Sequence, residues 1–169
     1  MQDTKEKKEM RCCIRILRSD AKEYLKQFHY LETVPGGSKS FALIEGGEVR
    51  GIVCTLQHGE EIELTRFMLL DNKKNEASRW LAFFLKFLKE ITVAERVITF
   101  ADPNVGHTGS IYRAVGGRLV SEGRDTIGFK VGDKIFSGRN MSYALCGKES
   151  RVIPVRLKGK LKFEFLLRS

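Results

Sequence analysis

The clearest structural signal in the sequence is a β-hairpin built from two apolar runs, residues 41–44 and 49–56. The runs flank Gly46 and Gly47, and glycine adopts the positive φ angles of tight hairpin turns more readily than other residues. A third run, residues 62–69, also has apolar side chains at strand spacing and should pair with the hairpin. An antiparallel sheet of this size has to bury one face, so the rest of the chain must supply elements that cover it.

Residues 75–91 change from strand spacing to helical spacing. Their large apolar side chains fall at i, i+3, i+4, i+7, i+8 and i+11, which places them in one stripe along a helix. A stripe of this kind belongs to a core far more often than to a binding surface, so we expect it to pack against the sheet. The stripe consists of Trp80, Phe83, Phe84, Phe87, Leu88 and Ile91.

The N-terminal part of the chain contains one further strand and one further helix. An alternating run at residues 12–17 predicts a strand. Ser19 and Asp20 follow as plausible N-cap residues of a helix that extends to about residue 28, because its apolar side chains again have helical spacing.

The second half of the chain begins with a short β-rich run, residues 96–101, and a short helix, residues 110–115. Residues 118–169 then alternate apolar with polar side chains between glycines, which predicts strands and turns. Helices inserted at intervals in a mainly antiparallel sheet indicate an α+β fold. We expect one domain over residues 1–169, with residues 1–10 as a flexible start.

The size and composition of the chain, 169 residues of which 42% are hydrophobic, are those of one globular domain. The longest apolar-rich run, residues 80–88, is too short to cross a bilayer, and the charged start lacks the apolar stretch of a secretory signal. We therefore expect no membrane partner.

The four cysteines have no C-x-x-C spacing, which favours reduced thiols and a cytoplasmic location. Cys12 and Cys13 should face opposite sides of a strand.

The net charge of +9 is concentrated at the C-terminal end. Residues 118–169 carry twelve Lys and Arg against five Asp and Glu, a net charge of +7, whereas residues 1–117 carry eighteen against sixteen, a net charge of +2. A concentrated positive surface attracts polyanions, nucleic acid first and acidic membranes or proteins second. The alternative is an ordinary solvated basic surface.

The polar segment LLDNKKNEASRW joins the third strand to the apolar-striped helix. The first backbone N–H groups of a helix are unpaired and carry the positive end of its dipole, so such a junction can bind an anion. Asn75 or Ser78 could help to hold a phosphate there, beside Lys73 and Lys74. The alternative is that these side chains only cap the helix.

The segment FADPNVGHTGSIYRA is the second junction of this type. Asp102 follows a buried strand and could accept a proton from an amine, His107 titrates near neutral pH, and the hydroxyl of Tyr112 can protonate a leaving thiolate. Ser110 lies at the start of the same short helix. The alternative is structural: Asp102 caps the turn, His107 precedes the helix and Tyr112 packs. The common motifs H-E-x-x-H, G-x-S-x-G and G-x-x-x-x-G-K-[ST] do not occur in the sequence.

Two further positions carry polar side chains where a site could form. His29 and Tyr30 lie at the end of the first helix, where a histidine often only interacts with the helix dipole. In ELTRF, strict alternation would place Arg66 on the same face as Leu64, the apolar face. A buried cation needs a partner, and Asp102 is a candidate.

The motifs FHY…PGG, ELTRF, NEAS and FADPNVGHTGSIYRA together resemble the Mom family of phage DNA-modification proteins, a divergent branch of the GNAT acyltransferase superfamily. The resemblance covers residues 28–124, and D-x-x-x-G-H-x-G-x-I-Y is its most specific part. It implies a GNAT-like splayed, mixed and mainly antiparallel sheet flanked by helices, with acetyl-CoA bound between strands 62–69 and 96–101. The pyrophosphate would lie at residues 75–78, where NKKNEAS replaces the usual glycine-rich loop. The implied cofactor-binding residues are Phe67, Met68, Asn75, Ser78, His107 and Ser110.

The activity that the resemblance implies is hypermodification of adenine in phage DNA at its exocyclic amine, ending in a carbamoylmethyl group that blocks host restriction enzymes. Simple acyl transfer would stop at acetyladenine, so this product needs further chemistry. Iron with His29 as a ligand is one suggestion, although the sequence has no metal-spacing motif. The matching positions expected at the active site are His29, Tyr30, Arg66, Asp102 and Tyr112.

An enzyme that reaches a base amine in double-stranded DNA must flip the base and hold the backbone with basic side chains. The expected phosphate contacts are Arg139, Arg151, Arg156, Lys158, Lys160 and Lys162. Two other functions stay open: an ordinary N-acetyltransferase acting on a small amine or protein, and a non-catalytic DNA-binding module on the same fold. The sequence leaves the oligomeric state open, with a dimer possible, and the location would be the host cytoplasm.

Overall fold

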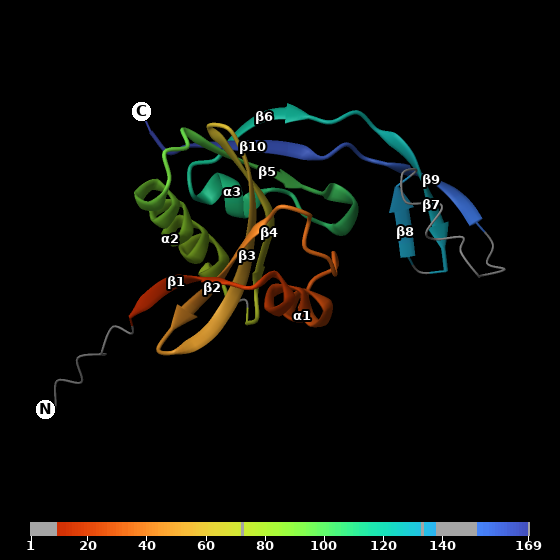
Figure 1. Ribbon diagram of the computed structural model, residues 1–169. Coiled ribbons are helices and arrows are strands. Elements are labelled where there is room, and N and C mark those ends of the chain that lie inside the picture. The colour runs from red at the N-terminus through yellow and green to blue at the C-terminus, as the bar shows by residue number, and fades with distance from the viewer. Residues whose placement is uncertain (1–9, 72, 133, 138–151, 169) are drawn as a thin grey trace, which may run out of the picture.

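The computed structural model in Figure 1 describes residues 10–71, 73–132, 134–137 and 152–168. It has a seven-stranded sheet covered by helices and a separate three-stranded sheet at one side. The elements in chain order are β1 (Arg11–Ile16), α1 (Arg18–Phe28), β2 (Lys39–Glu45), β3 (Glu48–His58), β4 (Glu61–Leu69), α2 (Glu76–Ile91), β5 (Arg96–Ala101), a 3-10 turn η1 (Pro103–Val105), α3 (Ser110–Ala114), β6 (Arg118–Glu122), β7 (Thr126–Val131), β8 (Lys134–Ser137), β9 (Val152–Leu157) and β10 (Leu161–Leu166).

The strands of the large sheet lie in the order β1-β2-β3-β4-β5-β10-β6. Each neighbouring pair is antiparallel except β4 and β5, which run parallel. The predicted hairpin is β2 and β3, and β4 pairs with β3 as expected. The predicted α+β fold with a mixed, mainly antiparallel sheet is therefore confirmed.

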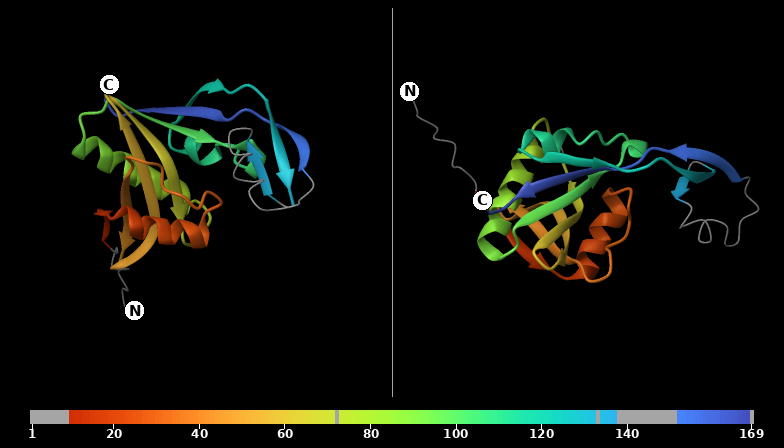
Figure 2. Two further views of the ribbon diagram at one scale, coloured as in Figure 1. Left: turned by 45° about the vertical axis from the view of Figure 1, so that its right-hand side comes forward. Right: turned by 90° about the horizontal axis from the view of Figure 1, so that it is seen from above.

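Helices cover both faces of this sheet (Figure 2). On one face α2 buries Trp80, Phe84 and Leu88 against β2 to β5 and β10, which confirms the predicted apolar stripe. On the other face α1 buries Ala21 and Leu25 against the middle strands. Two separate cores result, one on each side of the sheet.

The predicted start of α1 is wrong by two residues. The helix begins at Arg18, its N-cap position is Leu17, and no side chain caps it. Ser19 and Asp20 instead lie in the first turn, where their side chains hydrogen-bond to each other at 3.1 Å. A carboxylate in the first turn still interacts favourably with the helix dipole, so Asp20 stabilises the same end without acting as the cap.

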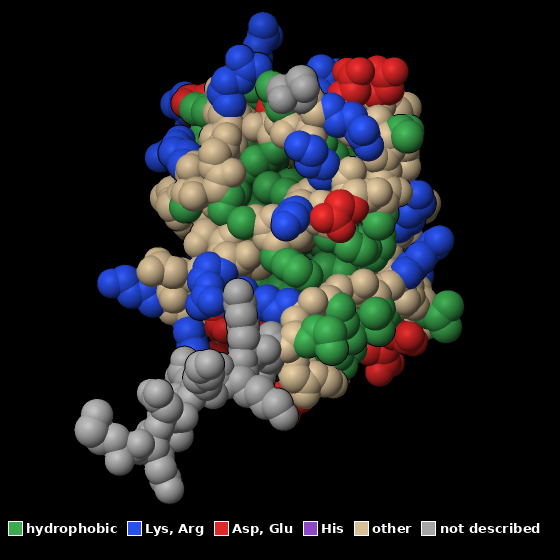
Figure 3. Space-filling view, turned by 90° about the vertical axis from the view of Figure 1, so that its left-hand side faces the viewer, with side chains coloured by type: hydrophobic (Ala, Val, Ile, Leu, Met, Phe, Trp, Pro, Cys, Tyr) green, Lys and Arg blue, Asp and Glu red, His purple; other side chains and the backbone are tan. Residues whose placement is uncertain are grey.

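The side of the molecule that carries α2 and the β1 edge shows apolar surface between Lys and Arg side chains (Figure 3). Phe83 and Phe87 of α2 are only partly buried against the core, and Ile91 at the end of the stripe is 54% exposed. Cys13 on β1 packs against the same core. The stripe is thus buried from Trp80 through Phe84 to Leu88 and becomes exposed at Ile91.

Strands β7, β8 and β9 form an arm that projects from the large sheet (Figure 1). β6 leads into β7, and β9 leads into β10, so two chain segments cross from the large sheet to the arm side by side. At the crossing, a Cβ atom on Gly159 would lie 1.7 Å from the carbonyl oxygen of Gly123. Only glycine allows the two backbones to approach this closely.

Strands β4 and β5 separate partway along their length, as the left view of Figure 2 shows. Their parallel pairing starts at Glu61 and Arg96 and ends at Leu64 and Thr99. Beyond Leu64, β4 stays paired with β3 on its other edge as far as Leu69. The result is a split in the sheet, and the edge of β4 that faces the split has no strand partner among the described residues.

Candidate active site at the split between two parallel strands

A β-bulge lies in β4 at the point where the split begins. Leu64 pairs with Thr55 of β3 and Arg66 pairs with Cys54, which leaves Thr65 as the extra residue. The hydroxyl of Thr65 donates to the carbonyl of Cys54 at 3.1 Å. A bulge interrupts the alternation of side chains, so the expectation that Arg66 follows Leu64 onto one face does not hold.

The guanidinium of Arg66 is half-buried and bonds to backbone carbonyls. Its Nε donates to Thr33 at 3.1 Å and its Nη1 donates to Thr65 at 2.7 Å. The suggested ion pair with Asp102 is therefore wrong, because the bulge directs the side chain towards the loop after α1. The remaining N–H groups of Arg66 can still donate to a molecule in the split.

His29 and Tyr30 follow directly after α1. The Nδ1 of His29 accepts the backbone N–H of Leu31 at 2.9 Å, and its ring stacks on Tyr30 with centroids 4.7 Å apart. Burial and the nearby charge of Arg66 lower the pKa of His29 to about 4. His29 is therefore neutral at physiological pH, and because Nδ1 accepts, its hydrogen lies on Nε2. It offers a hydrogen-bond donor rather than a base.

Tyr112, on α3, reaches the split from the face that α2 covers. Its hydroxyl lies 3.4 Å from the Oγ1 of Thr99, and its ring packs against Phe163 and Phe165 with centroids 5.3 and 6.3 Å away. Burial raises the pKa of Tyr112, and the hydrogen bond with Thr99 opposes the rise. Tyr112 is thus protonated at neutral pH and can act as a proton donor.

Asp102 begins the loop after β5. Its Oδ1 accepts from the backbone N–H of Asn104 at 3.0 Å and from the amide of the same residue at 2.8 Å, so the carboxylate caps the turn, as the structural alternative predicts. Its Oδ2 lies 3.7 Å from the Nζ of Lys160, and its backbone carbonyl accepts from His107 at 3.1 Å. Oδ2 has no other protein partner among the described residues.

The structure brings these side chains together from four segments of the chain. The ring of Tyr30 meets that of His107 edge to face, with centroids 5.4 Å apart. Burial raises the pKa of Tyr30, the carboxylate of Asp102 and the hydroxyl of Tyr112 raise it further, and the charge of Arg66 lowers it. These groups act on one another only because they lie close together. His29, Tyr30 and His107 thus form one ring cluster, and Asp102, Arg66 and Tyr112 lie near enough to Tyr30 to affect its pKa.

The side chains predicted to bind the cofactor lie in different environments. Met68 is buried in the core beneath α1 and Phe67 packs on the opposite core, so β4 can offer a ligand only the backbone of these residues. His107 joins the ring cluster described above. Ser110 is the first residue of α3 and is exposed.

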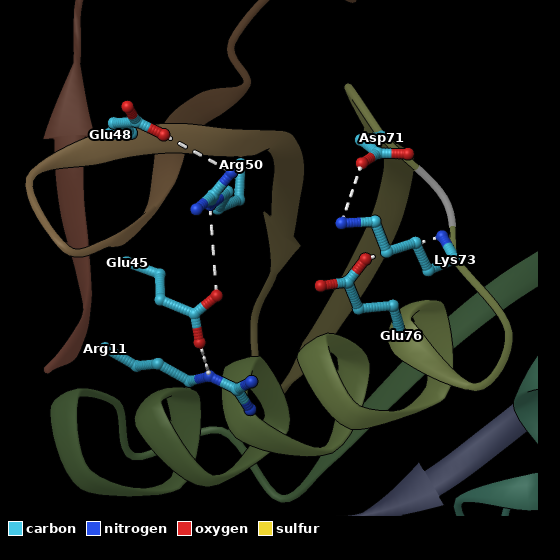
Figure 4. Close-up of polar contacts among 7 residues, drawn as sticks. All are labelled: Arg11, Glu45, Glu48, Arg50, Asp71, Lys73 and Glu76. Atoms are coloured by element: carbon cyan, nitrogen blue, oxygen red, sulfur yellow. Dashed lines mark hydrogen bonds and ion pairs between the residues drawn. The ribbon is translucent and has the colours of Figure 1, made fainter. Parts of the chain in front are cut away.

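The loop before α2 contains its own hydrogen-bond network (Figure 4). The hydroxyl of Ser78 donates to the carbonyl of Asn75 at 3.0 Å, and Asn75 has a φ of 65° without a side-chain cap bond. The carboxylate of Glu76 accepts the backbone N–H of Lys73 at 3.4 Å, and the Nζ of Lys73 pairs with Asp71 at 3.3 Å. Carboxylates thus occupy the region where the resemblance places a pyrophosphate.

Several residues of the site were not singled out from the sequence. Thr99 lies in an apolar run, and a lone hydroxyl on a buried strand is a signal that a partner exists, although it does not say which one. Asn104 has both of its amide atoms bonded to Lys158 across 54 positions of sequence. No local pattern predicts such a contact.

Four of the predicted phosphate-binding residues belong to the described part of the chain, on β9, on β10 or in the turn between them. Arg156 pairs with Asp125 at 2.9 Å, Lys158 and Lys160 flank the crossing point, and Lys162 lies on β10 opposite Phe100 of β5. Arg139 and Arg151 lie outside the described residues.

The described residues place no three His, Cys, Asp or Glu side chains together as a metal site. The Nδ1 of His29 accepts the N–H of Leu31, and no acidic or thiol side chain of the described residues contacts the His29 ring. This arrangement does not fit an iron site built on His29. Within the part of the chain that the structure describes, no helix is long and apolar enough to span a membrane.

Comparison with solved structures places the fold among GNAT acetyltransferases. An acetyltransferase of Bacillus subtilis in complex with CoA is similar with a TM-score of 0.60 and 12% identity, covering 94% of this chain and 99% of that one. The ribosomal-protein-S18-alanine N-acetyltransferase of Escherichia coli has a TM-score of 0.63, 10% identity and coverage of 95% and 96%. A GNAT acetyltransferase of Elizabethkingia anophelis with acetyl-CoA bound has a TM-score of 0.55, 8% identity and coverage of 92% and 97%.

The fold and the split sheet thus define a GNAT-fold, acyltransferase-like protein. The model of the Mom protein family matches residues 12–153, and the chain belongs to that family. A search of curated proteins finds no match.

Proposed function

We propose that this protein uses acetyl-CoA to modify adenine in double-stranded DNA at the exocyclic amine, and that the modification protects phage DNA from host restriction enzymes. The observation that carries the proposal is the position of Tyr112 and Asp102. Tyr112 lies beside Thr99 where the two parallel strands of the GNAT fold separate, and Asp102 follows β5 and lies 3.7 Å from Lys160 in the turn between β9 and β10. A proton donor, a carboxylate and a basic surface therefore meet at one place.

The split fits the chain-like part of the proposed cofactor. The backbone groups of residues 65–69 on the free edge of β4 can pair with the amides of a pantetheine arm in the manner of a missing strand. CoA would supply an acyl group activated as a thioester. Its pyrophosphate would bind near the start of α2, where the carboxylate of Glu76 would first have to leave the N–H of Lys73.

The side chains at the split divide the proton handling between them. The hydroxyl of Tyr112 holds a proton at neutral pH and would release it to a leaving thiolate. The Oδ2 of Asp102, which lies 3.7 Å from the Nζ of Lys160, would take the proton that the acceptor amine loses, directly or through water. The Nε2–H of His29 and the remaining N–H groups of Arg66 would orient the base by donating to its ring nitrogens.

The basic arm supports DNA as the substrate. Lys158 and Lys160 are exposed, and they lie at the turn that contacts the loop of Asp102. A phosphate held there would place the neighbouring base close to the split. Because a paired base cannot reach a split in a sheet, the adenine would have to be flipped out of the duplex.

Attack of the adenine amine on the thioester, with loss of the CoA thiolate, gives N-acetyladenine. The carbamoylmethyl group that the family resemblance implies as the end product additionally needs an amide nitrogen from a second reactant and a two-electron oxidant. That group is bonded to the amine through a methylene carbon, whereas direct acyl transfer bonds the amine through a carbonyl carbon. The two products differ in mass, so the product itself distinguishes them. The residues described above account for proton transfer at the amine and the thiolate only.

The test is mass spectrometry of nucleosides from DNA of cells that express the protein. A mass-shifted deoxyadenosine is expected with the wild type and with Tyr24→Phe, a control tyrosine on α1, and it should be lost in Tyr112→Phe and Asp102→Ala that remain folded. Unmodified DNA together with acetylation of a free amine by the purified protein would favour the ordinary acetyltransferase instead. Protection that survives both active-site substitutions would favour a non-catalytic DNA-binding module.

A further inference from the structure

Thr99 is a buried polar residue in the middle of the apolar strand β5. Its side chain is 1% exposed, and its register partner on β4 is Leu64, the last pair before the two strands separate. The Oγ1 of Thr99 lies 3.1 Å from the carbonyl oxygen of Leu64 and 3.4 Å from the hydroxyl of Tyr112. One hydroxyl thus joins the end of the parallel ladder to the proposed proton donor.

The hydroxyl of Thr99 has one hydrogen for these two partners. A carbonyl oxygen can only accept, so while Tyr112 is protonated Thr99 can donate to Leu64 and accept from Tyr112. If Tyr112 gives up its proton, the Thr99 hydroxyl can rotate and donate to the phenolate oxygen instead. Hydrogen bonds to an ionised oxygen are stronger than those between neutral groups, so this arrangement favours the phenolate.

We propose that Thr99 is a positioning residue that fixes the hydroxyl of Tyr112 at the split and stabilises its deprotonated form. The biological meaning of this role rests on the proposed function. The physical property itself, the ease with which Tyr112 loses a proton, exists with or without a substrate. A purely structural role, in which Thr99 only closes the ladder with Leu64, would leave that property unchanged.

The experiment measures the deprotonation of Tyr112 in the full chain without any ligand. The protein is labelled with difluorotyrosine, whose phenol titrates at lower pH than tyrosine, and each ring is followed by fluorine NMR across pH. The signal of Tyr112 is the one that disappears in Tyr112→Phe. Thr99→Val should raise the titration midpoint of Tyr112 by about one pH unit, because it removes the one hydroxyl of the described residues that hydrogen-bonds to the phenol.

Two further substitutions separate the hydroxyl from the shape of the side chain. Thr99→Ser keeps the hydroxyl and should leave the midpoint within a few tenths of a unit of the wild type. Thr55→Val makes the same chemical change at a buried threonine of β3, on the other side of Leu64, and should leave the midpoint unchanged. If Thr99→Val does not fold, Thr99→Cys keeps a weaker donor of similar size and should give a smaller rise.

An unchanged or lowered midpoint in Thr99→Val or Thr99→Cys would overturn the proposal, and so would a rise of equal size in Thr99→Ser. If the wild type modifies DNA, Thr99→Val should in addition lower kcat roughly tenfold with little change in the KM for acetyl-CoA. A shifted midpoint in a protein that leaves DNA unmodified would contradict the proposed function and leave the role of Thr99 intact.

Discussion

The side chain of Asn104 and the backbone of Lys158 hydrogen-bond to each other in both directions. The amide Nδ2 of Asn104 donates to the carbonyl of Lys158 at 2.9 Å, and its Oδ1 accepts the N–H of Lys158 at the same distance. Asn104 also donates to Asp102, so the loop that carries the candidate base is tied to the turn that leads into the arm. Contacts made by the arm can therefore affect the position of Asp102.

Replacing Asn104 tests this connection. Asn104→Ala removes both bonds to Lys158, and because they are exposed we expect a loss of about 1–2 kcal/mol in the free energy of unfolding. Asn104→Asp keeps one acceptor but places a second carboxylate beside Asp102, so it should lower stability at least as much. Urea unfolding measures both values. Wild-type stability in both variants would show that the two segments hold their positions independently.

The fold was largely predictable from local patterns, whereas the orientations of the candidate site residues were not. The hairpin through Gly46 and Gly47 and the stripe containing Trp80 follow from spacing alone, and the structure confirms them. The direction of Arg66 does not follow, because one extra residue in β4 changes the face of every later side chain and no residue type marks that bulge. The failed ion pair with Asp102 has this cause.

Contacts between distant segments were equally invisible in the sequence. Asn104 finds Lys158 only once β10 has paired with β5, which brings the two turns together. In the sequence Thr99 is one residue of an apolar strand, and only the structure shows its contact with Tyr112. Local propensity decides which elements form, but the register between strands decides which polar groups meet.

His29 makes the stability of the protein depend on pH. Its pKa is about 4 in the folded state and 6.5 in its ordinary state, so between these pH values the unfolded chain binds more protons than the folded one. The stabilisation is fully present above pH 6.5 and is lost as the pH falls towards 4. Because the ring is partly exposed, we expect the loss to be only about 1–2 kcal/mol.

His29→Asn should reduce this pH dependence, since the asparagine oxygen can still accept the N–H of Leu31 but carries no titrating group. His58→Asn at the exposed end of β3 serves as the control and should leave the dependence as it is. Unfolding curves at pH 4.5 and 7.5 supply the comparison. Equal slopes with pH in the wild type and in His29→Asn would show that the histidine is not the group responsible.

Glu76 should weaken the binding of CoA. Its carboxylate lies on the N–H of Lys73 at the start of α2, where a pyrophosphate would carry the same sign of charge (Figure 4). Glu76→Gln removes the charge and keeps the size, so we expect the Kd for CoA to fall by about three- to tenfold, a change of roughly 1 kcal/mol. Glu90→Gln near the other end of α2 is the control and should have little effect in calorimetric titration. An unchanged or raised Kd in Glu76→Gln would place the pyrophosphate elsewhere.

The lysines around the β9–β10 turn should set the salt dependence of DNA binding. A protein that neutralises phosphates releases counterions, and the slope of log K against log salt falls by about 0.9 for each contact with duplex DNA. Among the described residues, no acidic side chain forms an ion pair with Lys158 or Lys162, so both side chains are available to phosphates. Lys160 is partly engaged by Asp102 at 3.7 Å and should contribute less.

Lys158→Ala and Lys162→Ala should therefore each reduce the slope by about one and weaken binding to all sequences alike. Lys86→Ala, an exposed lysine on α2, should change neither the slope nor the affinity. Fluorescence anisotropy with a labelled duplex across a salt series provides both quantities. If Lys86→Ala reduced the slope as much as the turn variants did, DNA would lie across α2, and the placement of the duplex beside Asp102 would have to be abandoned.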